Sequence, residues 1–263
     1  MMNSETALNT ANVFSVFASI QGEGIYLGFP QIFIRLTGCN IRCSYCDTVD
    51  ALLPQAIARI EQTPFSGNLK LIPNPISAEM LAQFVRQLND SFVRFHSIAL
   101  TGGEPLMYAG FLKNLLPLLK QTGLPILLET NGTLPDQLEK IIKQVDIISM
   151  DIKIPSDIQT GQIEWKNTER FLQIACQRKC YVKIIVSNQT TLNLNEEFVT
   201  ACEIISRINP EISVVLQPAF YETNQKKYTF LSLKQVLAIY QLFRAKIKDV
   251  RTIPQVHKLM GWS

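Results

Sequence analysis

Three cysteines, Cys39, Cys43 and Cys46, stand close together near the N-terminus in the run Cys-Asn-Ile-Arg-Cys-Ser-Tyr-Cys. Cysteine thiolates are soft ligands that bind iron–sulfur clusters and zinc. A structural zinc site wants a fourth Cys or His nearby, and residues 1–95 contain none. The spacing therefore favours a four-iron cluster, on which three thiolates leave one iron open to a small chelating molecule.

A second motif, Thr101-Gly102-Gly103-Glu104-Pro105, follows a run that reads as a buried strand. Two residues without a Cβ let the backbone approach a ligand closely, and the Glu104 carboxylate is suited to an ammonium group. Taken alone, the motif is equally consistent with a tight turn between a strand and a helix. Polar residues that suit a ribose or a carboxylate follow the next two strands: Glu129, Thr130, Asn131, Asp151 and Lys153.

The elements that position these residues alternate along the chain. Buried strands are predicted at Val13–Ile20, Gln31–Leu36, Ser97–Leu100, Pro125–Glu129, Asp146–Met150, Tyr181–Val186 and Ser213–Gln217. Helices are predicted at Ala78–Leu88, Phe111–Leu119, Pro135–Lys143, Glu164–Gln177, Asn195–Ile208 and Leu233–Ile247. This alternation predicts an α/β fold, a partial or full (β/α) barrel of parallel strands with helices outside. The site of such a barrel lies at the carboxyl ends of the strands, where the motifs above converge.

The length of 263 residues suits one domain, spanning 1–263. Val49–Pro75 interrupts the alternation with several prolines around one short helical stretch, Gln55–Gln62. We interpret this segment as an insertion loop at about 49–76.

Composition narrows the class of protein. The chain is 47% hydrophobic and 18% charged, with a formal net charge of +3 and no basic run, so no nucleic-acid partner is indicated. It shows no leader and no apolar stretch long enough for a membrane helix, which predicts a cytoplasmic protein that does not bind a membrane. The six cysteines do not have the spacing of a disulfide framework, and a reducing compartment fits them better.

The C-x3-C-x2-C spacing, with Tyr45 before the last cysteine and the glycine motif further on, resembles the radical S-adenosylmethionine superfamily. The resemblance implies a [4Fe–4S] cluster on the three cysteines, with S-adenosylmethionine chelating the open iron. By the same resemblance, the residues that contact S-adenosylmethionine are Tyr45, Cys46, Asp47, Gly103, Glu104, Glu129, Asn131, Asp151 and Lys153.

A closer resemblance, to the 7-carboxy-7-deazaguanine synthase family, spans nearly the whole chain. It is carried by Ile20–Gly24, Phe33–Asn40, Cys46–Thr48, Thr101–Pro105, Asp151–Ser156, Leu216–Pro218 and Pro254–Lys258. It implies conversion of 6-carboxy-5,6,7,8-tetrahydropterin to 7-carboxy-7-deazaguanine with loss of ammonia, by way of hydrogen abstraction from C6, in queuosine and 7-deazapurine biosynthesis. The implied substrate contacts are Ile20, Gln21, Gly22, Glu23, Arg35, Thr101 and Ser263, the last on a C-terminal tail that closes on the site.

Within this resemblance, Thr48 takes the position that binds Mg²⁺, and the planar fork of Arg35 suits the pterin carboxylate. Asp151 departs from the family, many members of which carry Ser there. The resemblance also implies a homodimer and an electron donor such as flavodoxin or ferredoxin.

Two other functions stay open at this point. A glycyl-radical-enzyme activase would share the cysteine spacing and the glycine motif, but Gln21, Glu23 and Arg35 argue against it. A non-catalytic iron–sulfur or zinc protein would not need a glycine motif beside a three-ligand loop. His96 and His257 are the only histidines, and neither lies in a metal-like spacing.

Overall fold

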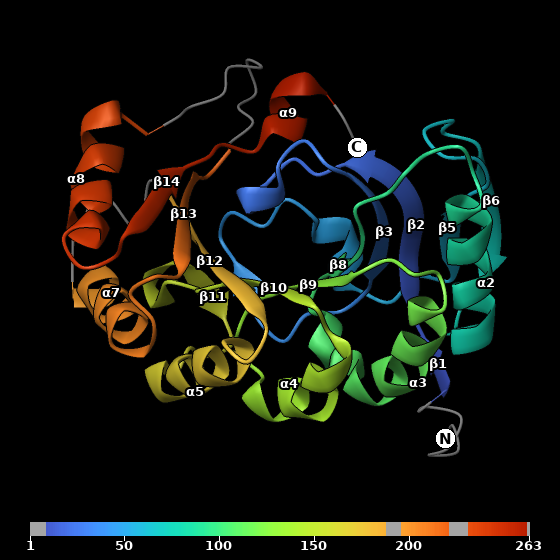
Figure 1. The fold of residues 1–263 in the computed structure, drawn as a ribbon, viewed down its shortest axis with the longest axis horizontal. Coiled ribbons are helices and arrows are strands. Elements are labelled where there is room, and N and C mark those ends of the chain that lie inside the picture. The colour runs from blue at the N-terminus through green and yellow to red at the C-terminus, as the bar shows by residue number, and fades with distance from the viewer. Residues whose placement is uncertain (1–8, 188–195, 221–230, 262–263) are drawn as a thin grey trace.

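A ten-stranded sheet forms the centre of the computed structural model, which describes residues 9–187, 196–220 and 231–261 (Figure 1). Its strands are β2 (Val13–Ile20), β3 (Pro30–Leu36), β5 (Ile57–Glu61), β6 (Leu69–Pro73), β8 (Ser97–Gly102), β9 (Ile126–Thr130), β10 (Ile147–Asp151), β12 (Lys179–Val186), β13 (Ser213–Pro218) and β14 (Asp249–Thr252). They follow the order β14-β13-β12-β10-β9-β8-β3-β2-β5-β6.

From β3 through β14 every neighbouring pair of strands is parallel. Helices connect these strands and cover the outside of the curved sheet (Figure 1). They are α2 (Ala78–Asn89), α3 (Ala109–Lys120), α4 (Pro135–Ile141), α5 (Trp165–Ala175), α7 (Glu196–Ile208) and α8 (Leu233–Arg244). The predicted partial (β/α) barrel is confirmed, and the larger apolar core lies between the sheet and these helices.

Alternation along the strands creates the floor of the site. Phe33, Ala99, Leu127 and Tyr181 belong to a small apolar cluster. Because side chains on one face of a strand recur every second residue, the next positions on that face lie two residues further along each strand. They carry the polar residues Arg35, Thr101, Glu129 and Lys183, which all line one cavity.

The segment 49–76 differs from the prediction. Its short helix at Gln55–Gln62 is wrong: β5 and β6 form an antiparallel hairpin there, and β5 pairs with β2 at the edge of the main sheet. In β5, Ile57 and Arg59 are exposed while Ala58 and Ile60 are buried, which is the period of a strand. Five residues are too few for that alternation to stand out against a helical pattern.

None of the described helices combines the length and the apolar character that crossing a membrane requires.

Candidate active site

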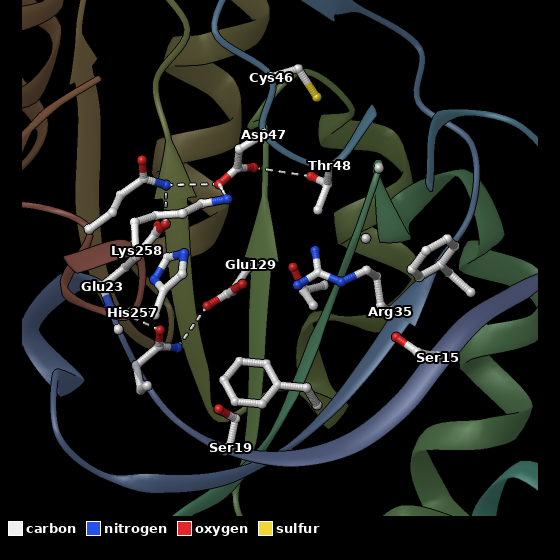
Figure 2. Close-up of a pocket in the computed structure, with 18 of the residues that line it drawn as sticks. Ser15, Ser19, Glu23, Arg35, Cys46, Asp47, Thr48, Glu129, His257 and Lys258 are labelled. Atoms are coloured by element: carbon white, nitrogen blue, oxygen red, sulfur yellow. Dashed lines mark hydrogen bonds and ion pairs between the residues drawn. The ribbon is translucent and has the colours of Figure 1, made fainter. Parts of the chain in front are cut away.

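A cavity of about 970 Å³ opens at the carboxyl ends of the parallel strands. The structure brings most of the predicted site residues together around it (Figure 2). Those that line it are Ile20, Gln21, Gly22, Glu23, Arg35, Cys39, Cys43, Tyr45, Cys46, Asp47, Thr48, Thr101, Gly103, Glu129, Asn131, Asp151 and Lys153. Glu104 is not among the lining residues, and Ser263 lies outside the described residues.

The cysteine loop follows β3 and is held by the Arg42 side chain and by backbone hydrogen bonds to a distant segment. Arg42 donates a hydrogen bond of 2.8 Å to the carbonyl oxygen of Cys39. The short strand β4 (Arg42–Cys43) pairs with β11 (Ile158–Thr160), and the Ser44 amide donates to the carbonyl oxygen of Asp157. Cys39, Cys43 and Cys46 are free, half-buried and on the wall of the same cavity. The loop therefore presents three sulfurs to one enclosed space.

The arrangement of these sulfurs is not that of a compact site for a single ion. A tetrahedral zinc ion with Zn–S bonds of about 2.3 Å holds its sulfurs about 3.8 Å apart. Among the described residues, only Glu23, Asp47 and His257 place three metal-binding atoms within 4.8 Å of one another, and the cysteines do not. Three spread thiols facing one cavity, with no fourth cysteine beside them, fit a [4Fe–4S] cluster with one open iron. Burial raises the pKa of the Cys39 and Cys43 thiols while no metal holds them as thiolates.

Gly103 and Glu104 contact the start of the cysteine loop, where the Glu104 amide donates a hydrogen bond to the carbonyl oxygen of Gly38. A Cβ on Gly103 would lie 1.9 Å from the carbonyl oxygen of Gly38, so the glycine permits a close approach between two chain segments. The fully buried Glu104 carboxylate accepts hydrogen bonds from Leu106 N, Thr130 Oγ1 and Asn131 N. Burial raises its pKa to about 7. A direct contact between Glu104 and a ligand stays a prediction.

Asn131 connects Glu104 to the cavity, which it lines. Its Nδ2 lies 3.8 Å from Cys39 Sγ and donates a bond of 2.9 Å to Asn40 Oδ1. The carboxylate that holds the Asn131 backbone therefore also positions a side chain against a cluster cysteine.

Asp151, Lys153 and Tyr45 form the next part of the wall. Lys153 Nζ lies 2.8 Å from Asp151 Oδ2 and 5.3 Å from the centre of the Tyr45 ring. Asp151 Oδ1 is buried and has no hydrogen-bond partner within the described chain. Buried polar atoms normally have a partner, so this oxygen fits a ligand donor such as a ribose hydroxyl.

Lys183, on β12, was not predicted, and it joins this wall to Glu23. Its Nζ forms an ion pair with Glu23 Oε2 and lies 3.7 Å from Asp151 Oδ2. Burial alone would raise the pKa of Glu23, but Lys183 outweighs it, with a smaller contribution from Gln255, and lowers that pKa to about 2. Glu23 is therefore held as a carboxylate at neutral pH.

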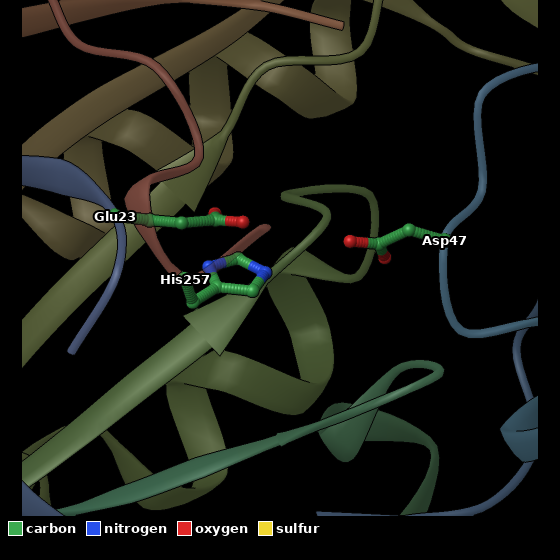
Figure 3. A group of neighbouring side chains, drawn as sticks. All are labelled: Glu23, Asp47 and His257. Carbon is green, nitrogen blue, oxygen red and sulfur yellow. The ribbon is translucent and has the colours of Figure 1, made fainter. Parts of the chain in front are cut away.

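The C-terminal segment closes the same side of the cavity, where α9 (Val256–Met260) docks. Gln255 Nε2 donates to both Glu23 Oε1 (2.8 Å) and Asp47 Oδ2 (2.9 Å). A Cβ on Gly22 would lie 2.3 Å from His257 Nδ1, so the glycine makes room for the His257 ring. That ring lies between the carboxylates of Glu23 and Asp47 (Figure 3).

Oxygen ligands for a hard cation gather beside the cysteine loop. Thr48 Oγ1 donates a hydrogen bond of 3.2 Å to Asp47 Oδ1, and both residues line the cavity (Figure 2). A hydroxyl and an adjacent carboxylate are the donors that Mg²⁺ prefers, together with waters and a substrate carboxylate. These residues therefore fit Mg²⁺.

Arg35 projects into the centre of the cavity (Figure 2). Its guanidinium lies 5.9 Å from the centroid of the Phe17 ring, and no carboxylate of the described residues pairs with it. Gln21, by contrast, is already engaged: Nε2 donates to Gln31 Oε1 and Glu129 Oε1, and Oε1 accepts from Glu23 N. The cavity thus offers the unpaired Arg35 guanidinium to an anionic group.

The residues missed from the sequence are Lys183, Gln255, His257 and Lys258. The tail residues were part of a quoted motif without an assigned role, whereas Lys183 is the one charged residue of the predicted strand Tyr181–Val186. That single interruption of a buried strand was the available signal.

Comparisons with known proteins agree with this geometry. Residues 33–198 match the Radical SAM superfamily. The 7-carboxy-7-deazaguanine synthase of Geobacter sulfurreducens is 39% identical over 95% of this chain and 97% of its own. The protein of the same name from Methanopyrus kandleri is 34% identical over 95% of this chain and 94% of its own.

Among solved structures, QueE from Escherichia coli shares the fold, with a TM-score of 0.56 at 20% identity over 95% of this chain and 94% of that one. The same family is indicated by three observations: the three cysteines on one cavity, the order of the motifs, and the similarity to two synthases over nearly the whole chain. The chain belongs to the 7-carboxy-7-deazaguanine synthase family of the Radical SAM superfamily.

Proposed function

We propose that this protein converts 6-carboxy-5,6,7,8-tetrahydropterin to 7-carboxy-7-deazaguanine with loss of ammonia, as a carbon–nitrogen lyase of queuosine and 7-deazapurine biosynthesis. The observation that carries the proposal is the unpaired Arg35 guanidinium at the centre of the cavity. Arg35 is half-buried and has no protein anion as partner, and the fork of Arg is suited to bind a carboxylate through two parallel hydrogen bonds. The pterin has such a carboxylate.

The chain divides the work between two sides of the cavity. Cys39, Cys43 and Cys46 would hold the [4Fe–4S] cluster, and S-adenosylmethionine bound there supplies the radical chemistry when the cluster is reduced. Asp151 and Asn131 offer hydrogen-bonding atoms on the S-adenosylmethionine side.

On the other side, Arg35 would fix the substrate carboxylate and Glu23, held ionised by Lys183, would accept hydrogen bonds from ring N–H groups. Thr48 and Asp47 would hold Mg²⁺ against the same carboxylate. The docked tail lines this side and would help to keep water from a reactive intermediate.

Turnover by the anaerobically reconstituted protein tests the proposal. The assay contains S-adenosylmethionine, dithionite, Mg²⁺ and the pterin, and mass spectrometry follows the deazaguanine. We expect product from the parent protein. Arg35→Met should lower kcat/KM for the pterin by about 100-fold, the loss typical of a charged hydrogen-bonding partner. The exposed Arg94, away from the cavity, provides the matched control Arg94→Met.

Other outcomes would change the proposal in defined ways. Release of 5′-deoxyadenosine without any deazaguanine would keep a radical enzyme and reject the pterin as substrate. Full activity of Arg35→Met would reject the assigned carboxylate site while leaving the reaction in place. The shared name of the relatives favours this reaction over glycyl-radical-enzyme activation, and no described feature favours a purely structural cluster.

Three finer properties complete the proposal. We propose a cytoplasmic enzyme, reduced by a flavodoxin or a ferredoxin, that forms a homodimer. Six cysteines without a disulfide in the described chain support a reducing compartment. The donor and the dimer are carried by the family resemblance alone.

A further inference from the structure

A continuous chain of hydrogen bonds runs through the barrel interior from the amino-terminal end of β8 to the cavity. We name the four residues His96, Ser97, Gln31 and Gln21 the buried amide chain. Ser97 and Gln31 are completely buried and Gln21 is 3% exposed. Three buried polar side chains in one barrel require a reason, because each costs free energy unless it is fully hydrogen-bonded.

Every link of the buried amide chain is short. Gln31 Nε2 donates to Ser97 Oγ at 2.9 Å, and Gln21 Nε2 donates to Gln31 Oε1 at 2.9 Å. His96 Nδ1 lies 3.0 Å from Ser97 Oγ at the other end. The His96 ring packs against Tyr26 and Phe29, with centroids 4.9 Å and 4.6 Å away, which fixes its plane.

At the cavity end, the chain contacts Glu23, predicted to bind the substrate, and Glu129, which was predicted to contact S-adenosylmethionine and is bonded here to Gln21 on the substrate side. Gln21 Nε2 also donates to Glu129 Oε1 at 2.9 Å, and Gln21 Oε1 accepts from the Glu23 amide at 3.1 Å. The Gln21 side chain therefore uses both of its N–H groups and its oxygen inside the protein. It acts on the cavity through Glu129 and Glu23.

The order of donors and acceptors permits only one orientation of each amide. A flipped Gln21 would place Oε1 against two acceptors, Gln31 Oε1 and the Glu129 carboxylate, and its NH2 against the Glu23 N–H. A flipped Gln31 would set its NH2 against that of Gln21. Burial, followed by the charge of Lys179, lowers the pKa of His96, which favours a neutral ring able to accept the Ser97 hydroxyl proton.

We propose that Gln31 and Ser97 are positioning residues for the substrate side of the cavity. They fix the Gln21 amide, and through it the Glu129 carboxylate and the backbone at Glu23. The proposal rests on the proposed function, because it assigns these residues to pterin binding rather than to stability alone. A chain of amides cannot easily pass a proton, since each amide would have to change tautomer, so the role is orientation.

A double-mutant cycle tests this role. Gln31→Met keeps the length of the side chain and removes both hydrogen bonds, and Gln21→Met removes the group through which Gln31 acts. We expect each variant to raise KM for the pterin about tenfold, with a smaller change in kcat, as for the loss of one positioned hydrogen bond. The double variant should be no worse than either single one, because the two act as a unit. Ser97→Ala should show the same direction.

Two further measurements make the test decisive. Ser213→Ala removes a strand hydroxyl that bonds Asp249, outside the cavity, and should leave KM and kcat unchanged. The rate at which 5′-deoxyadenosine is released without pterin measures whether the cluster and S-adenosylmethionine remain functional. If this rate falls as much as the turnover of pterin, the variants have general structural damage, and the inference is overturned. Additive effects in the double variant, or an unchanged KM in Gln31→Met, would overturn it as well. A parent protein that makes no deazaguanine would instead reject the proposed function.

Discussion

Lys183 is the cation on which the charge balance of the cavity depends. It pairs with Glu23 and lies near Asp151, so one ammonium group faces two neighbouring carboxylates. Lys183→Met leaves the Glu23 carboxylate without its main partner, so the pKa of Glu23 should rise from about 2 toward its usual range. We expect kcat/KM to fall on the order of 10–100-fold and its acidic limb to move to higher pH.

The pH dependence of kcat/KM in Lys183→Met provides the measurement. Lys140, on α4, is exposed and lies away from the cavity, so Lys140→Met is the matched control and should keep the parent profile. An acidic limb that does not move in Lys183→Met would contradict the role given to the ion pair.

The pKa of Glu104 is shifted in the opposite direction to that of Glu23, so we expect a second effect of pH, on stability. Its pKa is raised by burial from 4.5 to about 7, so the folded state without cofactor binds this proton more tightly than the unfolded chain. The stabilisation is complete below the unfolded pKa of 4.5 and is lost as pH rises toward 7. Between about pH 5 and pH 8 the Tm of the cofactor-free protein should therefore fall more steeply than that of Glu104→Gln.

Thermal unfolding of the two proteins across this range measures the difference. Glu79→Gln, on the exposed face of α2, should follow the parent curve. If the Tm of the parent and of Glu104→Gln changed equally with pH, the pKa of Glu104 would not be raised in the folded protein, which would contradict the prediction.

At the scale of elements, long apolar strands and their helices were predictable, and short polar strands were not. The predicted Val13–Ile20 is β2 residue for residue, and the predicted Ala78–Leu88 is α2 less one residue. β14 was missed because only one of its four residues is buried, so no apolar alternation marks it. β5 was wrongly predicted as part of a helix. Its five residues become a strand through their pairing with β2, which the local sequence does not reveal.

Glu61, at the end of β5, holds this hairpin to the sheet. Its buried carboxylate accepts from the Ala18 amide at 2.8 Å and the Gly67 amide at 3.1 Å. Glu61→Ala leaves both donors without this partner and should lower the free energy of unfolding by about 1–3 kcal/mol. Urea unfolding measures the change, and the exposed neighbour supplies the control Gln62→Ala. Equal stability of the two variants would mean that the hairpin is held by β2 alone.

At the scale of the whole molecule, the site is assembled from segments far apart in the chain. Glu23 contacts Lys183 and Gln255, 160 and 232 positions later. The sequence predicted that the strand ends converge, because parallel strands place their carboxyl ends at one edge. It could not predict which side chains pair there, because such pairs leave no local pattern. The buried amide chain could not be predicted for the same reason: Gln31 and Ser97 are far apart in the sequence and become neighbours only because β3 and β8 pair.

Because the cofactor site joins these segments, its occupation should stabilise the entire fold. The cysteine loop is tied to β11 through β4, and to β9 through Asn131, so a ligand that binds only the folded arrangement shifts the unfolding equilibrium by mass action. At about 100 times its Kd, S-adenosylmethionine should add about 2.7 kcal/mol to the stability of the cluster-loaded protein. Cys46→Ala should lose the iron and most of this increment, whereas Cys176→Ala, away from the cavity, should keep both. Anaerobic thermal unfolding with iron analysis measures the two together, and an undiminished increment in Cys46→Ala would mean that S-adenosylmethionine binds without the open iron that the three cysteines provide.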